Sequence, residues 1–395
     1  MKRIVLLFVI LFSFELSAQD TSSTLDRQSA ENTVDLKPGK SIFMLRGFYH
    51  SGFEATTTND ETEYNFNAGS IVPVLMFKQS DKLFFEAEFE GGFEDGEFEW
   101  GLEYADMSYV LNDYVTARAG KFILPFGTFM EKLHPAWINR LATRPLGYGE
   151  GGITPTSDVG VELRGAFYTG SLKLNYQVYL INGPQLKDGS VEPGQAGMLK
   201  FGYLEDNNRN KTAGGRLGIF PFSNSMMELG FSGLTGKVGT EGSAYENVRA
   251  DLFAIDFSLV KNVNFLKSIV NIKGQYNYSQ IGDANYLVPE DTTGLFYDFS
   301  NTSNTYYAQV SLRPSFVENE LIRRLELVGR YSTLQAPVGA LWEQNPTQVA
   351  LGLNYWIDWR TVLKMGYQTT DGLGDSESPD MLSNNMFYIH WAMGF

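Results

Sequence analysis

The last residues of the chain alternate between two kinds of side chain, and this pattern leaves few folds open. One set is apolar and largely aromatic (Phe387, Ile389, Trp391, Met393 and Phe395), and the other is mixed (Met386, Tyr388, His390, Ala392 and Gly394). Because successive side chains of a strand point to opposite faces, residues 384–395 predict a strand with one apolar face. A last strand of this kind is typical of barrels that cross an outer membrane; the terminal strand of a soluble β-sandwich is the alternative.

The same alternation recurs along the chain and predicts about sixteen strands. They lie near 41–53, 65–78, 82–93, 100–110, 114–125, 158–168, 171–181, 212–220, 226–236, 249–260, 267–281, 304–315, 323–334, 347–357, 359–369 and 385–395. Odd-numbered links are expected to be long (54–64, 126–157, 182–211, 237–248, 282–303, 335–346 and 370–384) and even-numbered links short (79–81, 111–113, 169–170 and 358). Outer-membrane barrels sort their loops in this way, with long loops outside and short turns on the periplasmic side.

The faces of the predicted strands also differ in charge. Near 82–93, an apolar set (Leu83, Phe85, Ala87 and Phe89) alternates with a mostly acidic one (Phe84, Glu86, Glu88 and Glu90). A charge facing lipid at the membrane midplane costs about 2–4 kcal/mol, so the polar faces are expected to line a wet interior. Lipid offers no partner to free backbone groups, and the sheet must therefore close. The mean hydropathy of −0.19 agrees, since only alternate residues would face lipid.

The start of the chain indicates export. Lys2 and Arg3 precede an apolar run over 4–14 and a small-residue site that ends at Ala18, which is the layout of a cleavable signal peptide. We therefore expect a signal peptide at 1–18, a flexible lead-in at 19–40 and an outer-membrane barrel at 41–395. The chain has no cysteine, which excludes disulfides, and its net charge of −15 disfavours a nucleic-acid partner.

Short glycine and aromatic motifs resemble those of a known family. They are 120–127 (GKFILPFG), 137–140 (WINR) and 160–165 (GVELRG), with 326–332 (ELVGRYS), 352–356 (GLNYW) and the final strand to Phe395. Together they resemble the phosphate-selective porin O and P family of Gram-negative outer membranes. The resemblance implies a sixteen-stranded, usually trimeric porin whose third outer loop folds inward to narrow the pore. The fold expected is thus an all-β, transmembrane, antiparallel barrel with an inward-folded third extracellular loop.

The longest predicted link, 126–157, is the candidate for that constriction. Its prolines and aromatic residues favour a packed shape over a mobile one. The charged residues expected at the constriction are Lys132, His134, Arg140, Arg144 and Glu150. The alternative is an ordinary surface loop.

Charged residues on the predicted inner faces are the candidate pore lining. The basic set is Arg118, Arg164, Lys173, Arg216, Lys273, Arg313, Arg330, Arg360 and Lys364; the acidic set is Glu86, Glu88, Glu90, Glu94 and Glu162. The acids crowd onto the third strand, which predicts a transverse field across the pore. Arginine forks suit phosphate, but the carboxylates oppose phosphate selectivity, so a general or weakly anion-preferring channel is expected.

The function expected is that of a porin, a channel for passive diffusion of small hydrophilic solutes and ions. A plugged barrel that acts as a structural, adhesion or partner protein through its loops is the main alternative, and an outer-membrane hydrolase is the third. The sequence predicts no catalytic residue, metal site or cofactor, because His50, His134 and His390 are expected to sit apart and no nucleophile motif accompanies them. Expected partners are outer-membrane lipid and lipopolysaccharide, two further copies in a homotrimer, and the barrel-assembly machinery, which would read Trp391, Met393 and Phe395.

Overall fold

The computed structural model describes residues 34–36, 41–58, 60–94, 97–149, 151–289, 295–373 and 381–395. The expected signal peptide, 1–18, lies outside these residues. Within the expected flexible lead-in, β1 (Val34–Leu36) forms a short strand that pairs antiparallel with the start of β2 (Ser41–Thr58). That part of the lead-in is therefore an addition to the sheet edge rather than an unpaired linker.

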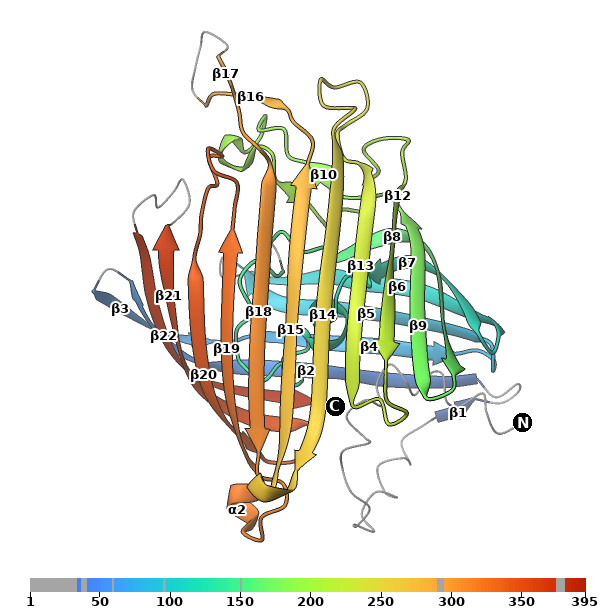
Figure 1. Ribbon diagram of the computed structural model, residues 1–395, viewed down its shortest axis with the longest axis vertical. Coiled ribbons are helices and arrows are strands. Elements are labelled where there is room, and N and C mark those ends of the chain that lie inside the picture. The colour runs from blue at the N-terminus through green and yellow to red at the C-terminus, as the bar shows by residue number, and fades with distance from the viewer. Residues whose placement is uncertain are drawn as a thin grey trace.

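The described residues form a closed antiparallel barrel (Figure 1). The second half of β2, residues 52–58, pairs with β3 (Glu61–Asn67), and its first half, residues 42–49, pairs with β4 (Ser70–Lys78). β3 and β4 are therefore two parts of one barrel strand. Counted in this way and without β1, the barrel has 16 strands, as the alternation predicted, and it closes where β2 pairs with β22 (Met381–Gly394). The other barrel strands are β5 (Leu83–Glu94), β6 (Glu97–Asn112), β7 (Val115–Ile123), β8 (Ser157–Thr169), β9 (Leu172–Ile181), β12 (Thr212–Phe220), β13 (Met227–Lys237), β14 (Arg249–Val263), β15 (Ser268–Ile281), β18 (Thr302–Arg313), β19 (Leu325–Gln335), β20 (Thr347–Trp356) and β21 (Thr361–Leu373).

Long links gather at one end of the barrel and short turns at the other, at the top and bottom of Figure 1. The prediction of a long first link, 54–64, is wrong, because β2 continues to Thr58 and β3 begins at Glu61. The third link is equally short, since β5 ends at Glu94 and β6 begins at Glu97. At the first of these links, residues 56–63 are polar on both faces and therefore lack the alternation that marks a half-buried strand.

Small elements decorate both ends. The long-loop end carries the two-residue pair β10 (Gln185–Leu186) and β11 (Leu199–Lys200), the hairpin of β16 (Asn285–Leu287) and β17 (Phe296–Asp298), and the 3₁₀ turn η3 (Pro193–Gln195). The short-turn end carries η4 (Asn264–Leu266) and the one-turn helix α2 (Glu320–Arg323), which Asn319 caps by accepting a hydrogen bond from the Ile322 amide at 3.2 Å. None of the helices among the described residues is both long and apolar enough to cross a membrane.

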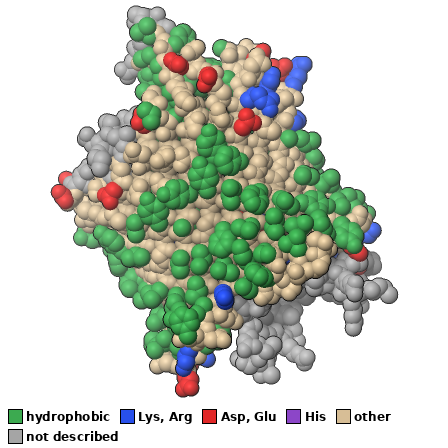
Figure 2. All heavy atoms as spheres, in the orientation of Figure 1, with side chains coloured by type: hydrophobic (Ala, Val, Ile, Leu, Met, Phe, Trp, Pro, Cys, Tyr) green, Lys and Arg blue, Asp and Glu red, His purple; other side chains and the backbone are tan. Residues whose placement is uncertain are grey.

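The outer face of the barrel carries a broad hydrophobic band. Figure 2 shows it around the middle of one face, with most charged side chains above and below. Leu163, Ile255, Val310, Leu351 and Met365 are among the large apolar side chains exposed on this surface. A monomeric soluble protein rarely exposes an apolar area of this extent, whereas a barrel in a bilayer requires one.

Candidate functional site

The link between β7 and β8, residues 124–156, folds into the barrel, and we call it the inner loop. Its entry depends on Gly127, whose φ of 68° lies in the left-handed region that favours glycine. A Cβ at Gly127 would lie 2.0 Å from the side chain of Gln275 on β15. Gln275 Oε1 accepts hydrogen bonds from the backbone amides of Thr128 (2.9 Å) and Phe129 (3.1 Å), so the loop begins docked on the opposite wall.

Aromatic packing fixes the next part of the inner loop. The π-helical turn η2 (Phe129–Leu133) places Phe129 edge-on against Tyr148 and against Tyr307 of β18, with ring centroids 5.0 and 5.6 Å away. The Tyr148 hydroxyl accepts a hydrogen bond from Asn277 of β15 at 2.7 Å. Both ends of the inner loop thus contact β15 and β18, and the loop is a packed element.

Ion pairs join the inner loop to several strands. Lys132 lies 3.2 Å from Glu228 of β13, and Arg140 lies 3.1 Å from Glu326 of β19. His134 Nε2 lies 3.3 Å from Glu88 Oε1 on β5. Glu131, the neighbour of Lys132 in the loop, accepts a hydrogen bond from Arg164 of β8 at 2.6 Å. The loop therefore contacts walls on several sides of the barrel.

Two buried cations hold the backbone of the inner loop. Lys364 Nζ on β21 donates to the carbonyl oxygens of Ala136 (2.5 Å), Asn139 (2.5 Å) and Leu141 (3.2 Å). Arg330 on β19 donates to the carbonyl oxygens of Thr143 (2.9 Å) and Arg144 (3.0 Å) in the same way. Both residues were expected to line the pore, but the structure uses them to fix the loop.

The remaining predicted basic residues are also largely engaged. Arg216 lies 2.7 Å from Asp256 and 2.8 Å from Glu228, and its side chain is fully buried. Arg118 and Arg164 both pair with Glu162. Lys173 lies over the Phe220 ring and Arg313 over the Trp356 ring, and Lys273 lies on the inward face of β15. Arg360, expected on a barrel strand, lies in the turn before β21 and stacks on Trp359.

The predicted acidic residues divide into two groups. Glu162 and Glu88 are paired as described, whereas no salt bridge or hydrogen bond joins Glu86 or Glu90 to another described residue. Glu103 on β6 adds a carboxylate to the same wall. The sequence prediction missed Glu103 because the pairing of β5 with β6 shifts between Glu88 and Phe89. This bulge interrupts the strict alternation of inward and outward side chains on which the prediction relied. Glu150 and the side chain of Glu94 lie outside the described residues.

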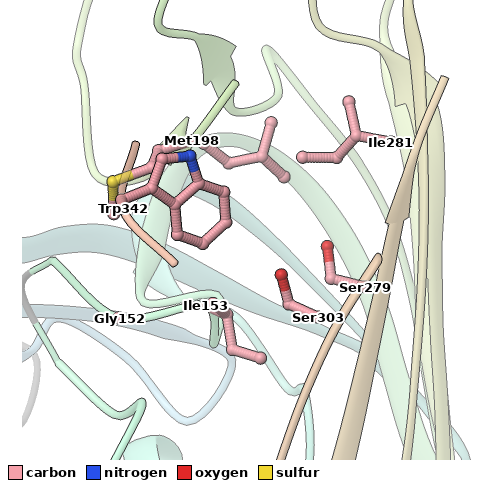
Figure 3. A pocket seen from close by; sticks show the side chains of 8 residues that line it. Gly152, Ile153, Met198, Ser279, Ile281, Ser303 and Trp342 are labelled. Carbon is pink, nitrogen blue, oxygen red and sulfur yellow. The ribbon is translucent and has the colours of Figure 1, made fainter. Parts of the chain in front are cut away.

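The inner loop leaves one side of the lumen accessible. Alternate residues of β13, β18 and β20 are buried on the inward face along almost the whole strand, because the loops cover them. Inward positions of β2 and β6 are mostly half-buried or exposed. Where the end of the inner loop meets the outer loops, the space between Ile153, Met198, Ser279, Ser303 and Trp342 is only ≈10 Å³, room for about one water molecule (Figure 3). We call the accessible region along β2, β5 and β6 the open side.

Two histidines lie together on the open side, so the expectation that all three sit apart is wrong. The rings of His50 and His390 stack with centroids 6.4 Å apart because β2 and β22 are neighbours only after the barrel closes. His50 Nε2 lies 3.0 Å from Ser70 Oγ, and His390 Nε2 lies 2.7 Å from Glu54 Oε1. Glu54 contacts His390, but no carboxylate among the described residues hydrogen-bonds to His50, so the Ser70 and His50 contact has no orienting acid like that of a hydrolase triad.

The expected assembly residues lie on the outer face. Trp391, Met393 and Phe395 are all exposed, and the backbone of Phe395 exchanges hydrogen bonds with Gly47 of β2 at 2.9 and 3.1 Å. The last residue therefore completes the closing strand pair. Across the part of the chain that the structure describes, no group of three or more His, Cys, Asp or Glu residues could hold a metal ion.

Comparisons with known proteins identify the fold. No family model matches the chain and no curated protein matches it, so the resemblance to the phosphate-selective porin O and P family stays a prediction. Among solved structures, the outer membrane channel DcaP of Acinetobacter baumannii is 12% identical with a TM-score of 0.58 and covers 92% of this chain and 99% of its own. The anion-selective porin from Comamonas acidovorans is 12% identical with a TM-score of 0.56 and covers 90% and 100%. OmpT of Vibrio cholerae in its trimer form is 13% identical with a TM-score of 0.52 and covers 90% and 99%. At these identities the likeness is one of fold, and the chain has the barrel of outer-membrane porins.

Proposed function

We propose that the protein is an outer-membrane porin through which small hydrophilic solutes and ions diffuse passively along the open side. The single observation that carries this proposal is the contrast in burial between the two halves of the inner wall. A barrel plugged by its inner loop would bury inward side chains all round, whereas here most inward side chains of β2 and β6 are half-buried or exposed. The channel and porin neighbours support the same function.

Planar-bilayer recording of the purified protein tests this function directly. Stable single-channel steps are expected, because water and ions can reach the half-buried inner faces of β2 and β6. A folded barrel that never conducts would favour the alternative of a plugged structural or adhesion protein. Release of product from ester or peptide substrates would instead favour a hydrolase, for which the described residues offer only the Ser70 and His50 pair.

The sign of the ion preference follows from which charges remain unpaired on the open side. The sequence predicted a weak preference for anions. However, several of the basic residues behind that prediction hold the inner loop or pair with carboxylates, while Glu86, Glu90 and Glu103 form no salt bridge among the described residues. Arg144 is an exposed cation of the inner loop. We therefore propose a modest preference for cations.

Replacing Glu86, Glu90 and Glu103 together by glutamine is expected to lower the ratio of cation to anion permeability by a factor of roughly five, equivalent to about 1 kcal/mol at the pore wall. The reversal potential in a salt gradient measures this ratio. The matched control replaces three exposed loop carboxylates, Glu205, Glu246 and Glu318, and should leave the ratio unchanged. A channel that already prefers anions, or a ratio that the triple variant does not lower, would contradict the proposed sign.

The surroundings of the barrel belong to the same proposal. We infer that it lies in the outer membrane as a homotrimer, in line with the trimer form of OmpT, and that the apolar outer strand ending at Phe395 is read by the assembly machinery. Cross-linking of the detergent-solubilised protein tests the homotrimer. Membrane insertion of a Phe395→Ser variant tests recognition of the last strand by the assembly machinery. A strictly monomeric protein would contradict the proposed trimer but not the proposed channel function.

A further inference from the structure

The outer face of the barrel carries a groove that no part of the proposed channel uses. It has a volume of ≈610 Å³ and runs along β12 to β15 near the long-loop end; its lining includes Ala213, Gly233, Thr235, Asp251, Phe253, Tyr278 and Gln280. These strands stand at the front of the barrel in Figure 1. The groove opens outward, because Thr235, Asp251, Phe253 and Gln280 are exposed while their neighbours Leu234 and Leu252 are buried toward the interior.

The floor of the groove is recessed because it lacks a side chain. Gly233 pairs directly with Phe253, and the nearest atom to a Cβ at Gly233 would be the Leu252 carbonyl oxygen at 3.9 Å. Phe253 and Tyr278, with ring centroids 4.9 Å apart, form a tall aromatic wall beside this gap. An apolar trough of this kind within the hydrophobic band suits an acyl chain.

The upper end of the groove is polar. Thr235, Asp251 and Gln280 lie at one level, since Asp251 is the register partner of both Thr235 and Gln280. Thr235 Oγ1 donates to Asp251 and accepts a hydrogen bond from Arg249 at 3.1 Å. The groove therefore changes from apolar to polar toward the long-loop end, as a membrane does between acyl chains and headgroups.

Two like charges face each other above this polar row. Lys237 and Arg249 are direct register partners on β13 and β14. Neither forms a salt bridge with a described residue, although the nearby Arg209 and Lys211 pair with Glu241 and Asp206. Like charges directly opposite on neighbouring strands repel each other unless an anion lies between them. Figure 2 shows Lys and Arg side chains gathered at the upper right of this face, above the hydrophobic band.

We propose that this groove binds a membrane lipid whose headgroup carries phosphate, with the phosphate between Lys237 and Arg249 and an acyl chain in the trough over Gly233. The Asp251 carboxylate and the Thr235 hydroxyl would contact the remaining hydroxyl or amide groups of the headgroup. The inference rests on the proposed membrane location but not on conduction, so a channel that fails to conduct would leave it standing.

Native mass spectrometry of the detergent-solubilised full chain, titrated with a bis-phosphorylated glycolipid or with the same lipid after phosphatase treatment, tests the site. The wild type is expected to retain the phosphorylated lipid preferentially. Each basic residue near the surface contributes about 1 kcal/mol, so Lys237→Gln with Arg249→Gln should weaken binding roughly thirty-fold. Gly233→Leu should abolish retention of both lipids, because its side chain fills the trough without meeting the backbone.

The matched control replaces Lys82 and Arg323, exposed near the short-turn end, by glutamine and should bind like the wild type. Heat-modifiable migration on gels verifies that each variant is folded, which separates loss of the site from loss of the barrel. Equal retention of the two lipids, or binding that neither the charge variant nor Gly233→Leu alters, would overturn the proposal. Loss of self-association in Gly233→Leu without any change in lipid binding would assign the groove to a second copy of the chain and would also overturn it.

Discussion

Methionine in place of Lys364 is expected to raise the single-channel conductance and to make the open current fluctuate. Lys364 Nζ donates to the carbonyl oxygens of Ala136, Asn139 and Leu141, and the residue is almost fully buried. A hydrogen bond from a charged donor contributes about 1.5–3 kcal/mol, and methionine removes all of these bonds while keeping most of the volume. The segment from 136 to 141 would then detach from β21 for part of the time and widen the passage.

Bilayer recordings of Lys364→Met, compared with wild type, measure both the mean conductance and its noise. The matched control is Lys261→Met, which removes an exposed lysine from β14 far from the inner loop along the register and should change neither quantity. Lys364→Arg retains a charged donor, and its conductance and noise are expected to lie between those of the wild type and those of Lys364→Met. A folded Lys364→Met barrel with the conductance and noise of the wild type would show that the loop does not depend on this lysine.

Loss of Arg216 is expected to destabilise the barrel more than any other single change to the inner wall. Its guanidinium lies between Glu228 and Asp256, and both carboxylates are nearly inaccessible to solvent. Removing one partner of a buried ion pair costs about 3–5 kcal/mol, because the carboxylates remain buried without compensation. Arg216→Met should therefore lower the urea concentration at which the barrel unfolds in detergent.

A compensating variant separates charge from packing in this cluster. If Arg216→Met is combined with Glu228→Gln and Asp256→Asn, the buried negative charges are gone and most of the lost stability should return. Lys132 would lose its partner Glu228 in this variant, so Lys132→Gln is included in both arms. Urea titrations followed by the heat-modifiable gel shift give the midpoints. If the compensated barrel is no more stable than the arm that carries only Arg216→Met and Lys132→Gln, packing rather than charge would explain the loss.

The sequence predicted which residues point into the barrel, but it did not predict which groups those residues contact. Arg330 and Lys364 were assigned inward positions from the alternation, and they lie there. What they bind are carbonyl oxygens of the inner loop, and 228 residues separate Lys364 from Ala136 along the chain. Side-chain alternation carries no information about such distant partners, so the same residues read as pore lining from sequence and act as anchors in the structure.

The neighbours across the barrel seam were hidden for a related reason. His50 and His390 come from the first and last strands, and only closure brings β2 beside β22. Glu103 was hidden by a local effect, the shift in pairing at Glu88 and Phe89. A bulge reverses the parity of one strand without changing the composition that sequence reasoning uses.

The sequence by itself determined the number of barrel strands, their approximate positions and which side of most strands is apolar. It did so because a membrane barrel must alternate its side chains with a period of two and must satisfy every backbone group through closure. Only the tertiary structure decided where the inner loop docks, which charges remain unpaired and where the outer wall is recessed at Gly233. These features arise from contacts between residues that are far apart in the chain, and no local pattern encodes such contacts.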